Sequence, residues 1–216
     1  MYPDILEPEA LELTEKLDFL KRFDFYLVGG TGLALQWAHR KSVDFDFFTS
    51  KEFTPEVLSS TIREQGIVFV ERSKTIGTLH CLLNGIKTSF VFYNEPLLYK
   101  TVDFHALKIA DWRDIVVEKL RTISDRGFKK DFYDFYIGVN KLGIEPVVDL
   151  VYRKFGDSIN YLPLLRGLIY FEDAERSKEE LIFLQDIGTW DMVKDYFIGH
   201  IKDFEKAFLQ RKGFKL

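Results

Sequence analysis

The chain has 216 residues and a formal net charge of −4, with 46% hydrophobic and 16% aromatic residues. That length is enough for one large or two small domains with their own cores. The negative charge excludes a global basic field, so a nucleic-acid substrate would need a local basic patch. Cys81 is the single cysteine, which excludes an internal disulfide and a zinc site built from cysteines and favours a reducing compartment.

The N-terminal residues 1–17 carry acids where a secretory signal needs a basic start and an apolar run. No stretch of about 20 apolar residues occurs, so the sequence excludes a membrane-spanning helix. We therefore expect a cytoplasmic protein without membrane contact.

The stretch Tyr26–Thr49, YLVGGTGLALQWAHRKSVDFDFFT, follows a first helix predicted from Pro8 to Leu20. Its apolar residues 26–28 predict a short strand that stops at Gly29-Gly30, where glycine permits a tight turn. Thr31 is placed to cap a short helix that ends near His39. Backbone N–H groups at such a turn and helix start suit a phosphate.

Residues 42–48 alternate as a strand does, with Val43, Phe45 and Phe47 on one face and Asp44 and Asp46 on the other. Residues i and i+2 on a strand lie roughly 7 Å apart, so both carboxylates can reach one hard cation such as Mg²⁺. The alternative is that both aspartates are the solvated face of an edge strand.

The segments that follow continue an α/β pattern. A helix is predicted at 53–65, a strand at 67–70, and a hairpin at 77–83 and 86–93 closed by Asn84-Gly85. The sheet should then have about five strands. From about residue 104 the pattern becomes helical, with further helices predicted at 147–155, 162–170 and 190–208.

Two helices of the second half carry charged residues in unexpected places. Asp111 is placed to cap a helix whose apolar stripe contains Lys119. Burial of an ammonium is costly, so Lys119 should either extend to the solvent or meet a carboxylate or phosphate. Asp131 and Asp134 are neighbours on a helix predicted from 131 to 142, where acids near the start also stabilise the helix by capping.

These residues resemble known patterns. A glycine pair, thirteen intervening residues and Asp44-Phe45-Asp46-Phe47 resemble the Gly-Gly/Ser and Asp-x-Asp motif of the nucleotidyltransferase superfamily, which includes polymerase beta. The segments GGTGLAL, HRKSVDFDFFT and EKLRTISDRGFKKDFYDFY are similar in sequence to members of the AbiEii/AbiGii family, which are toxins of type IV toxin–antitoxin systems. LIYFEDAERSKEEL and TWDMVKDYF extend the resemblance over nearly the whole chain.

The resemblance implies an α/β nucleotidyltransferase (polymerase beta-like) fold with a mixed sheet in residues 1–98, and a helical domain in residues 99–216 that closes the active-site cleft. It implies an enzyme that moves a nucleoside monophosphate from an NTP to an acceptor hydroxyl on RNA, tRNA, a nucleotide or a protein, with an antitoxin as partner. Mg²⁺ would be the cofactor, held by Asp44 and Asp46. The resemblance makes Asp44, Asp46, Lys119, Asp131 and Asp134 catalytic, and we expect Gly29, Gly30, Thr31, Arg40, Ser42 and Lys130 to bind nucleotide.

The sequence departs from the superfamily at one position. By resemblance, the third carboxylate of many members falls at Ser89. A serine hydroxyl is a poor Mg²⁺ ligand and a poor base. Two hypotheses therefore stand: an enzyme that completes its chemistry with other groups, or a degenerate transferase that binds a nucleotide or a partner without turnover.

Overall fold

A computed structural model describes residues 1–157 and 159–211. The chain forms two compact units, Met1–Trp112 and Arg113–Leu216. The first unit extends beyond residue 98, where the sequence predicted the division, because two short strands at 102–109 join the sheet. No helix in the described part of the chain is long and apolar enough to cross a membrane.

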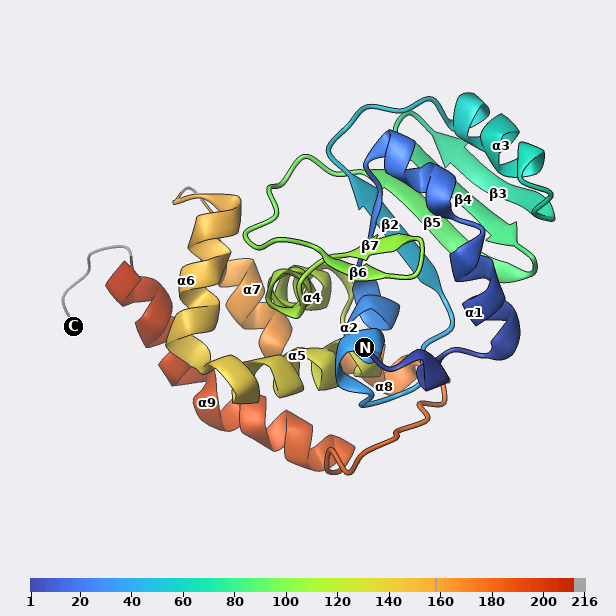
Figure 1. Ribbon diagram of the computed structural model, residues 1–216. Helices are drawn as coiled ribbons and strands as arrows, with labels where there is room; N and C mark the ends of the chain where they lie inside the picture. Colours follow the sequence, from blue (N-terminus) through green and yellow to red (C-terminus); the bar gives the residue numbers. More distant parts are fainter. Residues whose placement is uncertain (158, 212–216) are drawn as a thin grey trace. The chain divides into compact units, whose positions relative to one another are not determined.

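The first unit contains one mixed sheet with the strand order β3-β4-β5-β2-β1-β7-β6 (Figure 1). β2 pairs with β5 and β1 pairs with β7 in parallel, and the other neighbours are antiparallel. The expectation of about five strands is too low, because β6 and β7 were assigned to the helical half. The strands are β1 (Tyr26–Leu27), β2 (Phe45–Thr49), β3 (Phe69–Thr75), β4 (Thr78–Leu83), β5 (Ile86–Phe92), β6 (Val102–Phe104) and β7 (Leu107–Ile109).

Local sequence signals explain the edge of the sheet. Asn84 and Gly85 both have positive φ, 49° and 85°, as a type I′ turn requires, so the predicted hairpin is confirmed. The strand predicted at 67–70 begins at Phe69 and continues to Thr75. Its register against β4 shifts between Glu71 and Ser73, a bulge that disrupts this edge strand.

One face of the sheet is the core of this unit. Phe45 and Phe47 of β2, Phe90 of β5, and Leu79 and Cys81 of β4 are at most 2% exposed. The rings of Phe47 and Phe90 stack with centroids 5.3 Å apart. Because side chains alternate along a strand, the residues between these positions lie on the opposite face.

Helices in this unit are α1 (Pro8–Glu15), α2 (Gly29–Trp37) and α3 (Pro55–Glu64), with 3₁₀ turns at Pro3–Ile5 and Asp18–Phe23. α3 lies beside β3 (Figure 1) and confirms the predicted helix. Its Leu58 and Ile62 are buried in the sheet core. α1 is shorter than predicted: it ends at Glu15, and the buried Leu20 belongs to the 3₁₀ turn that follows.

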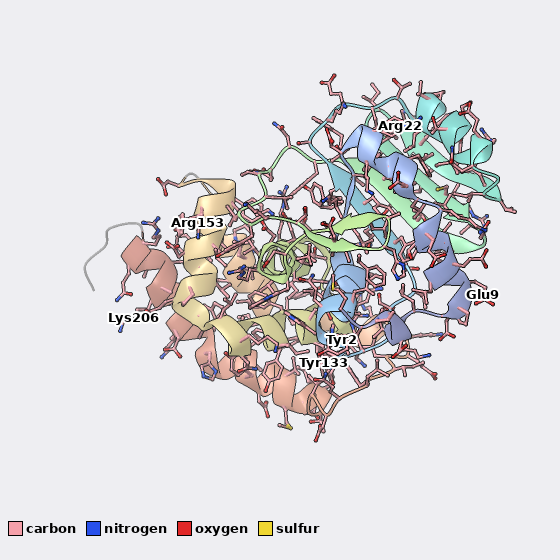
Figure 2. The ribbon with its side chains drawn as sticks, in the orientation of Figure 1. Tyr2, Glu9, Arg22, Tyr133, Arg153 and Lys206 are labelled. Atoms are coloured by element: carbon pink, nitrogen blue, oxygen red, sulfur yellow. The ribbon has the colours of Figure 1, made fainter. Side chains whose placement is uncertain are left out.

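The second unit is helical, as predicted. Its helices are α4 (Trp112–Arg126), α5 (Lys129–Leu142), α6 (Ile144–Phe155), α7 (Tyr161–Leu168), α8 (Glu172–Arg176) and α9 (Trp190–Arg211). Phe132 and Phe135 of α5 pack with Phe197 and Phe204 of α9, all fully buried. Tyr133, labelled in Figure 2, contacts the rings of Phe183 and Trp190.

Candidate active site

The first turn of α2 places backbone N–H groups beside an aspartate. α2 begins at Gly29, with Val28 at the N-cap, so both glycines lie inside the helix and not in a turn before it. Gly29 has φ 67°, which L side chains rarely adopt, and a Cβ built on it would lie 2.7 Å from Asp46 Oδ2. Only a residue without a side chain allows the helix start and this carboxylate to approach so closely.

Thr31 is not the helix cap that the sequence predicted. It is the third residue of α2, and its hydroxyl donates a hydrogen bond to the backbone carbonyl of Asp44. The same hydroxyl lies 2.9 Å from the Ser42 hydroxyl. Thr31 therefore attaches the segment before β2 to the helix, and with it the backbone that carries Asp44.

The two aspartates are partly buried, and only Asp46 lies within a strand. β2 begins at Phe45, so the strand predicted from Ser42 starts later, and Val43 is 60% exposed instead of buried with Phe45 and Phe47. Alternation holds from Phe45 onward, which keeps Asp46 on the face opposite the core. The backbone N–H of Val28 donates to the carbonyl of Asp46 at 2.8 Å, which fixes β2 beside the start of α2.

Ser89 is the direct neighbour of Asp46. The two residues are in register on the parallel strands β5 and β2, and the Ser89 hydroxyl donates to Asp46 Oδ1. This bond leaves Asp46 Oδ2 on the side of Gly29. Among the residues that the structure describes, no group of three or more His, Cys, Asp or Glu side chains is arranged to hold a metal ion.

Arg40 and Ser42 lie beside Gly30. A Cβ built on Gly30 would lie 2.3 Å from Arg40 Nη2 and 3.2 Å from Ser42 Oγ. Arg40 is only 2% exposed, and its Nη1 donates to the carbonyl of Lys41 at 3.0 Å. The structure thus places Gly29, Gly30, Thr31, Arg40 and Ser42 in one region with Asp46 and the backbone of Asp44.

A second charged cluster lies within the helical unit. Lys119 Nζ of α4 is 2.7 Å from Asp131 Oδ1 and 2.8 Å from Asp134 Oδ2 of α5. The three side chains are 7%, 5% and 0% exposed, so Lys119 meets carboxylates and does not reach solvent. Asp131 Oδ2 also accepts the backbone N–H of Phe128 at 3.4 Å, which makes Asp131 a helix cap as well. Lys130, by contrast, forms a more exposed ion pair with Glu179.

A similar cluster, not predicted from the sequence, includes residues of the same helix α4. Lys154 of α6 is 3.0 Å from Asp114 Oδ1 and 3.1 Å from Glu118 Oε1 of α4, and its side chain is 2% exposed. The signal was present, because Lys154 follows the buried Val147 by seven residues and Val151 by three, which places it in the apolar stripe. Lys119 was detected by that same reasoning.

Comparison with known proteins identifies the family. The chain is 38% identical over 204 residues to the uncharacterized protein aq_aa25 of Aquifex aeolicus, covering 91% of this chain and 94% of that protein. The chain belongs to the family of aq_aa25. No protein-family model matches the chain.

Solved structures show what fold this family has. The chain resembles JHP933 from Helicobacter pylori with a TM-score of 0.54 and 15% identity, over 96% of this chain and 97% of that one. It resembles MenT4, a nucleotidyltransferase toxin of Mycobacterium tuberculosis, with a TM-score of 0.56 and 16% identity, over 94% and 89%. The predicted nucleotidyltransferase fold, with a mixed sheet followed by helices, is confirmed.

Proposed function

We propose that this member of the aq_aa25 family is a nucleotidyltransferase that moves a nucleoside monophosphate from an NTP to an acceptor hydroxyl and releases pyrophosphate. The observation that carries the proposal is that the first turn of α2 lies close to Asp46. A Cβ built on Gly29 would lie only 2.7 Å from Asp46 Oδ2. Phosphate oxygens bind well to N–H groups at a helix start, so phosphate and carboxylate would adjoin there. The fold shared with the nucleotidyltransferase toxin MenT4 supports the same reaction.

Mg²⁺ is the cation that fits these groups. It commonly binds one or two carboxylates, water and substrate phosphates, so Asp44 and Asp46 are a sufficient protein contribution. Ser89 donates to Asp46 and adds no third carboxylate, which favours one firmly held ion. When bound, Mg²⁺ would act as a Lewis acid on the phosphates and align them.

The other residues of the first unit would bind and orient the nucleotide. Gly29 and Gly30 leave the N–H groups of α2 accessible to phosphate oxygens, because neither carries a side chain. The Arg40 guanidinium beside Gly30 adds positive charge to that helix end. Thr31 holds the backbone of Asp44 through a hydrogen bond to its carbonyl and lies beside the Ser42 hydroxyl.

The roles that the resemblance gives to residues of the helical unit are a separate part of the proposal. Lys119 would neutralise negative charge that develops on the phosphates, Asp131 would assist the acceptor hydroxyl, and Asp134 and Lys130 would support them. The salt bridges of Lys119 with Asp131 and Asp134 favour a structural contribution for these three residues in addition.

Transfer of label tests the reaction. Purified protein is incubated with each α-labelled NTP, Mg²⁺, and total RNA or tRNA as acceptor. Asp44→Ala and Asp46→Ala should each reduce incorporation by about 10²-fold or more, because each removes a ligand of the cation that stabilises the transition state. Asp103→Ala is a matched control, since Asp103 is an exposed aspartate on β6 of the same sheet. Incorporation unchanged by Asp44→Ala would refute the proposed site.

A binding protein without turnover is the second candidate, favoured by Ser89 in the place of a third carboxylate. It predicts that calorimetry detects NTP binding while no acceptor gains label. A toxin with an antitoxin partner, acting in the cytoplasm, is the proposed biological setting, and the similarity to MenT4, a nucleotidyltransferase toxin, supports the toxin role. Expression in a bacterial host should then arrest growth, and Asp46→Ala should relieve the arrest; equal growth of the two strains would refute the toxin role.

A further inference from the structure

Polar residues form a row across the face of the sheet that carries Asp46. Asp46 of β2 is in register with Ser89 of β5, Ser89 with His80 of β4, and His80 with Ser73 of β3. The neighbours of His80 along its strand, Leu79 and Cys81, are buried in the core on the opposite face, whereas His80 is exposed. His80 and Asp46 therefore lie on the same face, on either side of Ser89.

The spacing of strands sets the distance between these groups. Neighbouring strands lie about 4.8 Å apart, so the backbones of His80 and Asp46 are separated by roughly 10 Å, with Ser89 between them. Side chains that are directly opposite on antiparallel strands have Cβ atoms about 5 Å apart, which brings His80 next to the Ser89 hydroxyl. A substrate hydroxyl over Ser89 would thus lie between the imidazole of His80 and the carboxylate of Asp46.

The chemistry of the row offers a base within the first unit, whereas the resemblance gives assistance of the acceptor hydroxyl to Asp131 of the helical unit. Ser89 uses its hydroxyl proton in the bond to Asp46 and is too weak a base to take another proton at neutral pH. Asp46 would hold the cation. The other residues of this face on β4 and β5, both fully described, are Thr78, Leu82, Lys87 and Val91, none of them a base at neutral pH. An imidazole is the side chain best suited to accept a proton there.

We propose that His80 is the general base of the transfer reaction, in place of the carboxylate that Ser89 replaces. This role rests on the proposed function. As the oxygen of the acceptor hydroxyl forms its bond to the α-phosphorus, the hydroxyl proton passes to a ring nitrogen of His80. The bond from the α-phosphorus to the bridging oxygen breaks at the same time, and pyrophosphate leaves with that electron pair.

His80→Ala tests the role. Single-turnover transfer of label should slow by about 10²-fold or more, the usual contribution of a general base. Binding of NTP with Mn²⁺, measured by calorimetry, should change less than about twofold, because His80 does not hold the nucleotide. His105→Asn is the matched control: it removes another exposed histidine of the same unit, in a turn between β6 and β7 where φ is 50°, which asparagine tolerates.

Two rescues separate proton transfer from structure. Imidazole added to His80→Ala should restore transfer at least about tenfold, since it supplies the missing base. The double variant His80→Ala, Ser89→Asp should also regain transfer, because a carboxylate then stands beside Asp46. A loss of transfer that neither change restores would overturn the base role and indicate a structural one.

The outcomes also separate this role from the function on which it rests. Active wild-type protein with an equally active His80→Ala variant would overturn the role of His80 and leave the transferase intact. Wild-type protein that transfers label to no acceptor would overturn the transferase, and the base role with it.

Discussion

Lys119→Met should strongly destabilise the helical unit. The substitution keeps the length of the side chain and removes the charge that faces Asp131 and Asp134 at 2.7 and 2.8 Å. At an effective dielectric constant of 20, each contact is worth about 6 kcal/mol before desolvation, which costs several kcal/mol per ion. Removal of the cation leaves two carboxylates that are 5% and 0% exposed, so the net loss should be about 3–5 kcal/mol.

Hydrogen exchange of α4 and α5 measures this loss within the unit concerned. Because about 1.4 kcal/mol corresponds to a factor of ten, the slowest amides should exchange about 10²–10⁴-fold faster. Lys194→Met is the matched control: Lys194 also meets two carboxylates, of Glu175 and Asp191, at 3.0 Å, but its side chain is 25% exposed and theirs are 48% and 82%. Its loss should stay below about 1 kcal/mol. Equal exchange in the two variants would refute the argument.

A triple variant separates stability from chemistry. Replacement of a buried ion cluster by uncharged groups of similar size is often neutral for stability. Lys119→Met, Asp131→Asn, Asp134→Leu should therefore regain most of the protection that Lys119→Met loses. If the stable triple variant transfers label at the wild-type rate, the catalytic roles implied for these residues are wrong.

Three further predictions follow from close contacts and burial. Gly30→Ala should displace Arg40, since the new Cβ would lie 2.3 Å from Arg40 Nη2. The variant should bind NTP about tenfold more weakly in calorimetry. An unchanged affinity would exclude Arg40 from the nucleotide site. Gly138→Ala should cost about 1–3 kcal/mol in urea unfolding, because its Cβ would lie 2.4 Å from Val116 Cγ2, and Val116→Ala should recover part of that loss. Burial, and to a lesser degree the Glu71 carboxylate, raise the pKa of the Cys81 thiol from 9.0 to about 12, so its thiolate at pH 8 is about 10³-fold scarcer than in the unfolded chain. Disulfide reagents should react with the folded protein correspondingly slowly, and stability should fall as the pH rises above 9, where the unfolded thiol ionises first.

Local patterns in the sequence predicted those parts of the fold that depend on interactions between residues close together in the chain. The alternation of Phe45 and Phe47, the turn at Asn84-Gly85 and the apolar stripe around Lys119 each depend on neighbours a few residues away. The cost of burying an ammonium predicted that Lys119 would reach either solvent or an anion, and the structure shows that it meets the carboxylates of Asp131 and Asp134.

Features set by long-range pairing were not predictable in this way. β6 and β7 are three residues each, and β7 joins the sheet only because Ile109 pairs with Leu27 of the two-residue strand β1. The helix begins at Gly29 and Thr31 does not cap it; instead the Thr31 hydroxyl donates to the carbonyl of Asp44, a contact between separate elements. Such pairings depend on the register between strands, which the periodicity of hydrophobic residues within one strand or helix does not predict.

The alignment of His80 with Asp46 was missed for the same reason. Neither residue type nor spacing along the chain places a histidine of β4 beside the Asp-x-Asp strand. Only the two registers, Asp46 with Ser89 and Ser89 with His80, bring them to one row.

The parallel pairing of β2 with β5 has a consequence for the order in which the protein becomes competent. Asp46 and its partner Ser89 are 43 residues apart, with α3, β3 and β4 between them. Contacts between residues this far apart in sequence form late in folding. The entropy of closing the intervening loop is lost before the strand pairing contributes any stabilisation. A ribosome-bound chain that ends before β5 lacks the Ser89 hydroxyl that donates to Asp46. The orientation of Asp46 is therefore completed only after the chain has been extended through β5.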